Sequence, residues 1–284
     1  MSPAPALSTV TIGNGPVALV TDEYRVPDAR GVVLLWHGGG QTRHSWKATA
    51  EHVARAGWTA VSVDTRGHGD STWAPDGDYS MDVLVGDVVA AAQRYPSPVL
   101  IGASLGGLMS LVAVGTGRVA ARGLVLVDVA PRIERDGTRR IGEFMRRHAE
   151  TGFADLDEVA DAVAAYNPHR PRPTSTDGLR KNVRRRDDGR WYWHWDPRMM
   201  RADADEPSRQ VDVDMLRSAA RRISVPTLLV RGRQSDVLSE EGVRDFLELV
   251  PHAGFVDVGG TGHMVAGDDN DAFGGAITEF LARV

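Results

Sequence analysis

A serine stands at the centre of a Gly-x-Ser-x-Gly pattern that runs from Gly102 to Gly106. The apolar run before it, residues 99–103, predicts a short strand, and the run after it, residues 105–115, predicts a helix. Small residues at such a junction permit a sharp turn that strains the serine backbone and exposes its hydroxyl. We therefore predict that Ser104 is a nucleophile for acyl transfer rather than an ordinary helix-capping serine.

A serine hydroxyl is a weak nucleophile until a base removes its proton, so a histidine must reach it. Among the nine histidines, His263 lies in a glycine-rich loop between the last apolar strand and the last helix. A loop at that place can reach the carboxyl edge of a parallel sheet, where the serine turn also lies. We predict that His263 is the general base; otherwise it is a surface-loop histidine.

The third member of such a triad is a carboxylate, and in strand-turn-helix hydrolases it lies between the serine and the histidine in sequence. Two aspartates follow predicted strands in this interval. Asp236 follows residues 227–231 and is the predicted acid. Asp128 follows residues 124–127 and is the alternative; its other role would be to hold the adjoining loop by accepting backbone hydrogen bonds.

A run of glycines, Gly38 to Gly40, follows the apolar strand at residues 32–36. Glycines let the backbone approach a substrate carbonyl, so a main-chain N–H can stabilise the oxyanion of a tetrahedral intermediate. We predict the N–H groups of Gly39 and Leu105 as the two donors. A phosphate-binding loop is disfavoured because no Lys-Ser/Thr pair follows. Further residues expected to border the substrate are His37, Gly38, Gly40 and Met264.

Short β-rich runs alternate with helix-like segments along most of the chain, which predicts an α/β fold with a largely parallel sheet flanked by helices. The turn pair Asn14-Gly15 separates the first two runs and predicts an antiparallel hairpin. The remaining strands are expected at residues 32–36, 58–63, 99–103, 124–127, 227–231 and 254–258. Helices are expected at residues 45–56, 80–95, 105–115 and 240–249, with a last one ending near residue 283.

The strand-helix rhythm stops between residues 131 and 220, where the sequence becomes rich in arginine and is interrupted by prolines. We predict an inserted, mainly helical cap over 131–220, and a core formed by 1–130 and 221–284. Between residues 170 and 201 there are ten Arg or Lys against four Asp, which indicates a solvated cationic face. The cap also holds Trp191, Trp193 and Trp195, which alternate and so would share one side of an extended segment. They are expected either to line an apolar substrate pocket or to form the cap's own core.

Composition narrows the class of function. A net charge of −5, from 33 basic and 38 acidic side chains, gives no electrostatic reason to bind nucleic acid or anionic lipid. The chain has no cysteine, which excludes disulfides and thiolate chemistry. No signal peptide or membrane-spanning run is recognisable, so we expect a cytoplasmic protein. The acidic run at residues 268–271 lacks the glutamate of a calcium loop, and no metal or cofactor is expected.

Taken together, these motifs resemble the α/β-hydrolase superfamily over essentially the whole chain. The resemblance rests on His37-Gly38, the run Asp64-x-Arg66-Gly67-His68-Gly69-Asp70-Ser71, the serine turn, the Asp236 segment and Gly262-His263. It implies an eight-stranded, mostly parallel sheet. Within the superfamily the pattern is similar to the capped esterases, lactonases, cofactor-free haloperoxidases and carbon-carbon-bond hydrolases. His68 is interpreted as a structural residue of its loop.

One departure indicates the reaction. Epoxide hydrolases and haloalkane dehalogenases of this superfamily carry aspartate at the turn, whereas residue 104 is serine, which favours acyl transfer. We expect hydrolysis of a small carboxylic ester or lactone. A carbon-carbon-bond hydrolase or perhydrolase with the same triad is the alternative, and a non-catalytic ligand receptor on this scaffold is the third possibility.

Overall fold

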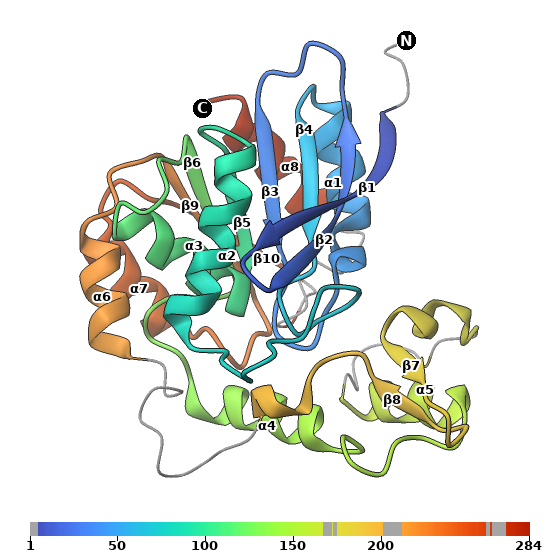
Figure 1. The fold of residues 1–284 in the computed structure, drawn as a ribbon. Helices are drawn as coiled ribbons and strands as arrows, with labels where there is room; N and C mark the ends of the chain where they lie inside the picture. Colours follow the sequence, from blue (N-terminus) through green and yellow to red (C-terminus); the bar gives the residue numbers. More distant parts are fainter. Residues whose placement is uncertain (1–4, 167–171, 173–174, 201–211, 260–261, 263–270) are drawn as a thin grey trace.

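The structure is a computed structural model that describes residues 5–166, 172, 175–200, 212–259, 262 and 271–284. Among them, eight strands form one sheet in the order β1-β2-β4-β3-β5-β6-β9-β10 (Figure 1). Strands β1 and β2 pair as an antiparallel hairpin, β2 is antiparallel to β4, and the other neighbours are parallel. The predicted fold class and the amino-terminal hairpin are therefore confirmed. The strands are β1 (Ala6–Asn14), β2 (Val17–Arg25), β3 (Val32–Trp36), β4 (Thr59–Val63), β5 (Val99–Ala103), β6 (Gly123–Val127), β9 (Thr227–Gly232) and β10 (Gly254–Val258).

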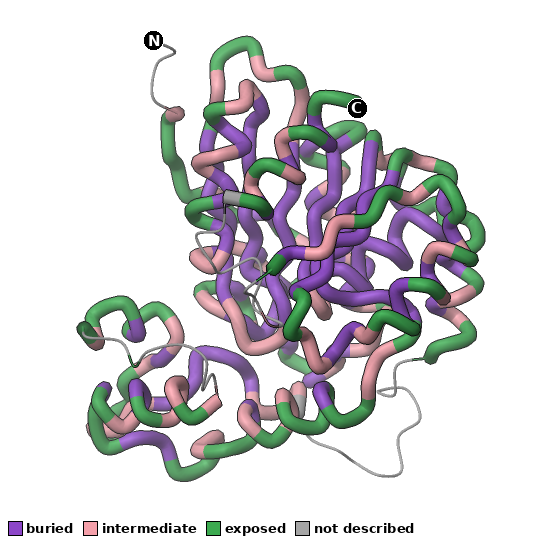
Figure 2. Tube along the Cα trace, turned by 180° about the vertical axis from the view of Figure 1, so that it is seen from behind, coloured by how far each residue is buried: buried purple, intermediate pink, exposed green. Residues whose placement is uncertain are grey.

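Helices cover both faces of the sheet, and alternate residues of β3 pack against the helices of opposite faces. Leu34 and Trp36 pack with the helices of one face, while Val33 and Leu35 pack with those of the other. A strand buried on both sides is apolar at every position, as this one is. Figure 2 shows buried residues along the strands and more exposed ones on the outer surfaces of the helices. The first face carries α2 (Met81–Arg94), α3 (Leu105–Gly115), α6 (Val213–Arg221) and α7 (Glu240–Leu249); the second carries α1 (Lys47–Arg55) and α8 (Asp271–Leu281).

The described parts of residues 131–200, named here the inserted segment, follow β6 and lie below the sheet in Figure 1. They have a small apolar core of their own, built around Phe153, Val159, Trp193 and Trp195. Their elements are α4 (Arg135–Arg146), α5 (Leu156–Tyr166), η2 (Asp177–Lys181), β7 (Val183–Arg185), β8 (Trp191–Trp193) and η3 (Pro197–Met200). The segment faces η1 (Arg43–Trp46) and the loops that follow β3 and β5.

One boundary differs from the prediction. The sequence assigns residues up to 220 to the cap, but α6 packs against α3 and buries Leu216, Ala219 and Ala220 in the main core. This helix therefore belongs to the sheet domain. No helix in the described ranges is long and apolar enough to cross a bilayer.

The contact between α3 and α6 allows a stability test at Gly115. A Cβ atom at this position would lie 2.2 Å from the backbone oxygen of Ala219, so Gly115→Ala must push the two helices apart. We expect the free energy of unfolding in urea to fall by about 1–3 kcal/mol. Gly86→Ala in α2 is the matched control, because its nearest neighbour lies at 3.7 Å and alanine favours a helix. Equal stability of the two variants would contradict this packing.

Candidate active site

Ser104 occupies the sharp turn between β5 and α3 with φ 48° and ψ −117°, a conformation that L-residues rarely adopt. The neighbouring glycines make this turn possible. A Cβ at Gly102 would lie 2.3 Å from the Gly106 oxygen, and one at Gly106 would lie 2.4 Å from the Trp36 oxygen. Any other residue at these two positions would displace the backbone. The serine is left partly exposed and lines a cavity.

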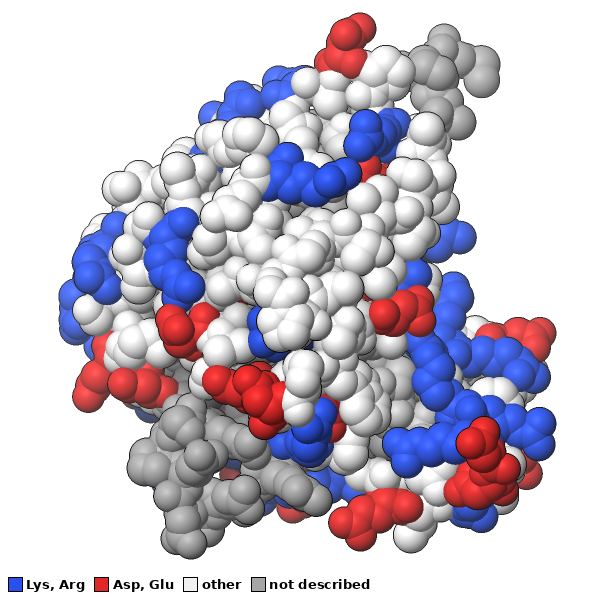
Figure 3. Space-filling model, viewed as in Figure 1, with Lys and Arg blue, Asp and Glu red and all other residues white. Residues whose placement is uncertain are grey.

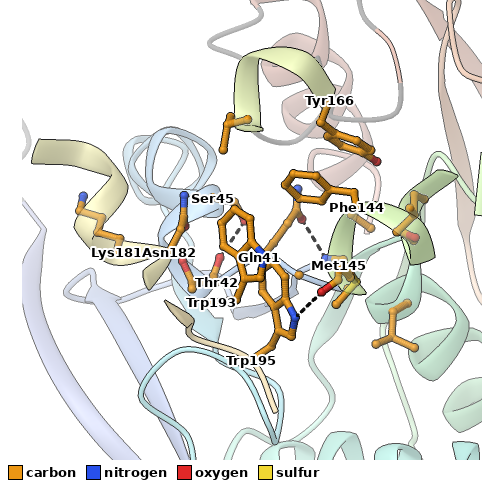
Figure 4. A pocket seen from close by; sticks show the side chains of 18 of the residues that line it. Gln41, Thr42, Ser45, Phe144, Met145, Tyr166, Lys181, Asn182, Trp193 and Trp195 are labelled. Carbon is orange, nitrogen blue, oxygen red and sulfur yellow. Dashed lines mark hydrogen bonds between the residues drawn. The ribbon is translucent and has the colours of Figure 1, made fainter. Parts of the chain in front are cut away.

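The cavity holds about 500 Å³ and lies between Ser104 and the inserted segment. Its walls come from segments that are far apart in sequence, and Figure 4 shows how their side chains converge. Trp193 and Trp195 stack with ring centroids 4.7 Å apart, and Phe144 lies 5.2 Å from Trp193. A site of this size with mostly apolar walls suits a small organic substrate.

The loop after β3 passes directly beside the serine. A Cβ on Gly38 would lie 3.2 Å from the Cβ of Ser104. The Gly38 N–H donates to the side-chain oxygen of Gln41 at 2.9 Å, and the Gly40 N–H donates to His68 Nε2 at 3.0 Å. By contrast, no acceptor among the described residues takes the N–H of Gly39 or of Leu105, and both residues line the cavity. Two unused donors beside a serine are what an oxyanion site requires.

Three buried histidines hold this region together. The ring centroids of His37 and His68 are 5.0 Å apart, and those of His68 and His194 are 5.8 Å apart. His37 Nδ1 lies 2.8 Å from the Gly38 oxygen, which can only accept, so this nitrogen carries the proton. His37 Nε2 is then the acceptor for the Thr65 N–H at 3.0 Å.

His68 and His194 follow the same logic. His68 Nε2 accepts from Gly40, and its Nδ1 lies 3.2 Å from the Arg66 oxygen. His194 Nδ1 accepts from the Gly69 N–H at 2.7 Å. Each ring is thus a neutral acceptor for a backbone N–H of another loop. The structural interpretation of His68 agrees with this geometry, whereas the equally buried His194 was not identified from the sequence.

Burial sets the charge state of these rings. It lowers the pKa of His37 to about 4. Burial, followed by the neighbouring His37, lowers the pKa of His68 to about 3. The pKa of His194 is also well below its usual value, mainly because of burial. Although the rings lie together, the described residues contain no cluster arranged to hold a metal ion.

A network of ion pairs also holds the loops after β3 and β4. Arg43 is buried and pairs with Asp64, and its guanidinium also lies 2.8 Å from Asp70. The backbone N–H groups of Arg43 and Asp70 both donate to the Asp64 carboxylate, at 2.6 Å and 2.9 Å. Asp70 in turn accepts from Arg184 of the inserted segment at 2.6 Å. The network therefore joins the loop after β3, the loop after β4 and the inserted segment.

The two candidate acids have different surroundings. Asp128 is completely buried at the end of β6, where Val127 accepts the Ser104 N–H at 3.1 Å. Its carboxylate accepts from the Gly232 N–H at 2.9 Å and from the Ser235 hydroxyl. Asp236 has a side chain 36% exposed and forms an ion pair at 3.1 Å with Arg140 of α4.

His263 and Met264 lie outside the described residues. Their neighbour Gly262 is described, and a Cβ on it would lie 3.8 Å from the backbone oxygen of Gln234, in the loop after β9. The chain just before residue 263 therefore approaches the loop that carries both Ser235, the hydrogen-bond partner of Asp128, and Asp236.

The other predicted site residues divide into two groups. Gly38, Gly39, Gly40, Leu105, Trp193 and Trp195 line the cavity with Ser104. His37 does not, because its ring is buried beneath the loop and bonded to Thr65. Trp191 does not either: the Arg180 guanidinium lies 5.1 Å from its ring, and it packs against the core of the inserted segment. Trp193 and Trp195 both line the cavity and belong to that core, so the two expected roles coincide.

Several cavity residues were missed from the sequence. Ile141, Phe144 and Met145 form a helical stripe on α4, which was visible as a pattern but did not show which surface it would face. Met145 touches the glycine loop: a Cβ on Gly40 would lie 3.4 Å from its side chain. Tyr166, Lys181 and Asn182 have no sequence signal of their own and reach the cavity only through the fold of the inserted segment.

Comparison with known proteins gives consistent results. The family described as "alpha/beta hydrolase fold" matches residues 31–269. Esterase Rv0045c of Mycobacterium tuberculosis is 32% identical over 244 residues, which cover 83% of this chain and 78% of that protein. The 3-hydroxybutyrate-oligomer hydrolase of Cupriavidus necator is 27% identical and covers 82% of each chain. A solved structure of the mycobacterial esterase matches with a TM-score of 0.76 at 26% identity, covering 99% of this chain and 93% of that one.

The buried histidines predict how stability depends on pH. Because their folded-state pKa values lie below 6.5, only the unfolded chain takes up these protons as the pH falls from 6.5 to 5. The free energy of unfolding should therefore fall by about 1.4 kcal/mol per pH unit for each such histidine. His68→Gln, which keeps an acceptor, should reduce this slope by one histidine's share. Urea titrations at several pH values between 6.5 and 5 measure this slope. A free energy of unfolding that stays constant across the interval would contradict the conclusion that these histidines are neutral in the folded protein.

Proposed function

Since the chain belongs to the α/β-hydrolase fold family, we propose that it is a serine hydrolase that cleaves a small, largely apolar carboxylic ester or lactone through an acyl-enzyme. The observation that carries the proposal is the position of Ser104: its backbone is strained, and it lines a cavity together with Gly39 and Leu105, whose N–H groups have no acceptor among the described residues. The likeness to an esterase over most of both chains supports an esterase-type activity.

In the proposed mechanism, His263 removes the hydroxyl proton as Ser104 attacks the substrate carbonyl. The oxyanion accepts hydrogen bonds from the N–H groups of Gly39 and Leu105. The tetrahedral intermediate collapses, the alcohol leaves with the proton from His263, and an acyl-serine remains. Water, deprotonated by the same histidine, then hydrolyses this ester and regenerates the serine.

For the acid we propose Asp128, the alternative in the sequence analysis, in place of Asp236. A triad carboxylate must stabilise a transient imidazolium, so it has to be buried, oriented and negatively charged. Asp128 is fully buried beside the serine turn, and neutral donors on Gly232 and Ser235 orient it. The charge of Asp236 is instead offset by Arg140, and its side chain reaches solvent.

The cavity supports the proposed substrate class. Its walls around Ser104 are formed by Leu105, Ile141 and Met145, together with the stacked Trp193 and Trp195. Such walls favour a short acyl chain or a small ring.

Ser104→Ala should reduce kcat for 4-nitrophenyl butyrate by several orders of magnitude, because it removes the hydroxyl that forms the acyl-enzyme in the proposed mechanism. The folded wild-type protein should also be labelled at Ser104 by a fluorophosphonate probe, and the alanine variant should not. Ser110→Ala is the matched control, since this buried hydroxyl donates to the Gly106 oxygen inside α3 and does not line the cavity. Retention of most activity in Ser104→Ala would refute the proposal.

The choice of acid has its own test. Asp128→Asn should lower kcat by about 10³- to 10⁴-fold, as expected when a triad histidine loses its carboxylate. Asp236→Asn should change kcat by less than about tenfold, because it breaks only a partly exposed ion pair with Arg140. Near-ultraviolet circular dichroism establishes that each variant is folded. A large loss in Asp236→Asn with a small one in Asp128→Asn would assign the role to Asp236.

A further inference from the structure

The cavity has two chemically different sides. Phe144 and Tyr166 stand on one side, and Lys181 and Asn182 stand together on the other, beyond the stacked tryptophans (Figure 4). Thr42 and Ser45 lie toward the second side, and they come from η1 and the loop before it (Figure 4). A substrate that lies along this cavity therefore meets apolar groups at one end and polar groups at the other.

Lys181 is the only Lys or Arg among the described residues that line the cavity, and none of those lining residues is Asp or Glu. His44, which also lines it, has its pKa lowered mainly by burial and then by Arg43, so its ring favours the neutral form. The lining thus carries an ammonium group without a matching carboxylate, in a molecule whose net charge is −5.

The other cations near Lys181 in sequence already have partners. Arg184 pairs with Asp70, Arg180 lies over the Trp191 ring, and Arg186 lies over the Tyr192 ring. Arg185 donates to the Gly189 oxygen, and Arg190 donates to the oxygens of Thr151 and Gly152. Within the part of the chain that the structure describes, the Lys181 amine has no ion pair or hydrogen bond. Figure 3 shows the general pattern on the inserted segment, where basic and acidic side chains lie close together.

We propose that Lys181 binds a carboxylate of the substrate, so that the enzyme prefers esters that carry a carboxylate at the end away from the scissile bond. The inference rests on the proposed function for the reaction, but it assigns a substrate class that the apolar walls alone do not indicate. A carboxylate is matched by one ammonium group and by the adjacent Asn182 amide, which can donate a second hydrogen bond.

Kinetics on matched ester pairs test the proposal. The first pair is mono-4-nitrophenyl glutarate and its neutral methyl ester, with the charge on the acyl chain. The second is 4-carboxyphenyl butyrate and its methyl ester, with the charge on the leaving group. Wild type should prefer the anionic member of at least one pair by about 10- to 100-fold in kcat/KM. No preference in either pair would overturn the proposal.

Variants at Lys181 locate the effect. Lys181→Met should remove the preference by lowering kcat/KM for the anionic ester while leaving that for the neutral ester within about twofold. Lys181→Arg should retain most of it. The control is Arg185→Met, an exposed cation on β7 that does not line the cavity and should leave both values unchanged. An equal loss on charged and neutral esters in Lys181→Met would contradict a role in charge recognition.

Binding separates this inference from the proposed reaction. Calorimetry with Ser104→Ala should show monomethyl glutarate binding about 10-fold or more tightly than dimethyl glutarate, and the added Lys181→Met change should abolish the difference. Turnover of neutral esters without charge preference would leave the hydrolase function standing and refute the role of Lys181. Charge-dependent binding without any esterase turnover would support the role of Lys181 and refute the proposed reaction.

Discussion

The site depends on the hydrogen bond from the Gly40 N–H to His68 Nε2. In the proposed mechanism the loop after β3 places the Gly39 peptide toward Ser104, yet its glycines give the loop little conformational preference of its own. Its shape is therefore held by two hydrogen bonds, one from Gly40 to His68 of the next loop and one within the loop from Gly38 to the Gln41 side chain. Both of these N–H groups are therefore used, whereas the Gly39 N–H has no acceptor among the described residues. In the proposed mechanism it is left for the substrate oxygen.

The same requirement explains why the supporting histidines are buried and neutral. A protonated imidazole could not accept a backbone N–H, so the pKa of His68 has to remain far below neutral pH. Burial beside His37 achieves this through desolvation. Keeping these rings neutral lowers the free energy of unfolding in acid. It also fixes the peptide groups of the glycine loop before a substrate binds.

The inserted segment is fixed to the same framework. His194 accepts from Gly69, the Asp196 N–H donates to the Gly67 oxygen at 2.9 Å, and Tyr79 donates to the Asp196 carboxylate at 2.6 Å. The loop after β4 is therefore bonded on one side to the glycine loop and on the other to the segment that carries the cavity tryptophans. Changes in the position of that segment would be transmitted to the glycine loop, which carries the proposed donor Gly39, through a few buried hydrogen bonds.

The sequence predicted those features that are encoded locally. The strands, the turn at Ser104 and the glycine loop depend on neighbouring residues, and they agree with the structure. Residues whose role depends on distant packing were not predicted: Lys181 is an ordinary charged residue until the fold of the inserted segment places it in the lining of the same cavity as Ser104. The α6 helix was assigned to the cap because the alternation of strands and helices had stopped, although its apolar positions match the surface of α3.

Asp128 and Asp236 each follow a parallel strand, so sequence order cannot distinguish them. What separates them is dielectric environment: a carboxylate that is buried and held by neutral donors keeps its influence on an imidazolium, whereas one that faces solvent and a guanidinium loses much of it.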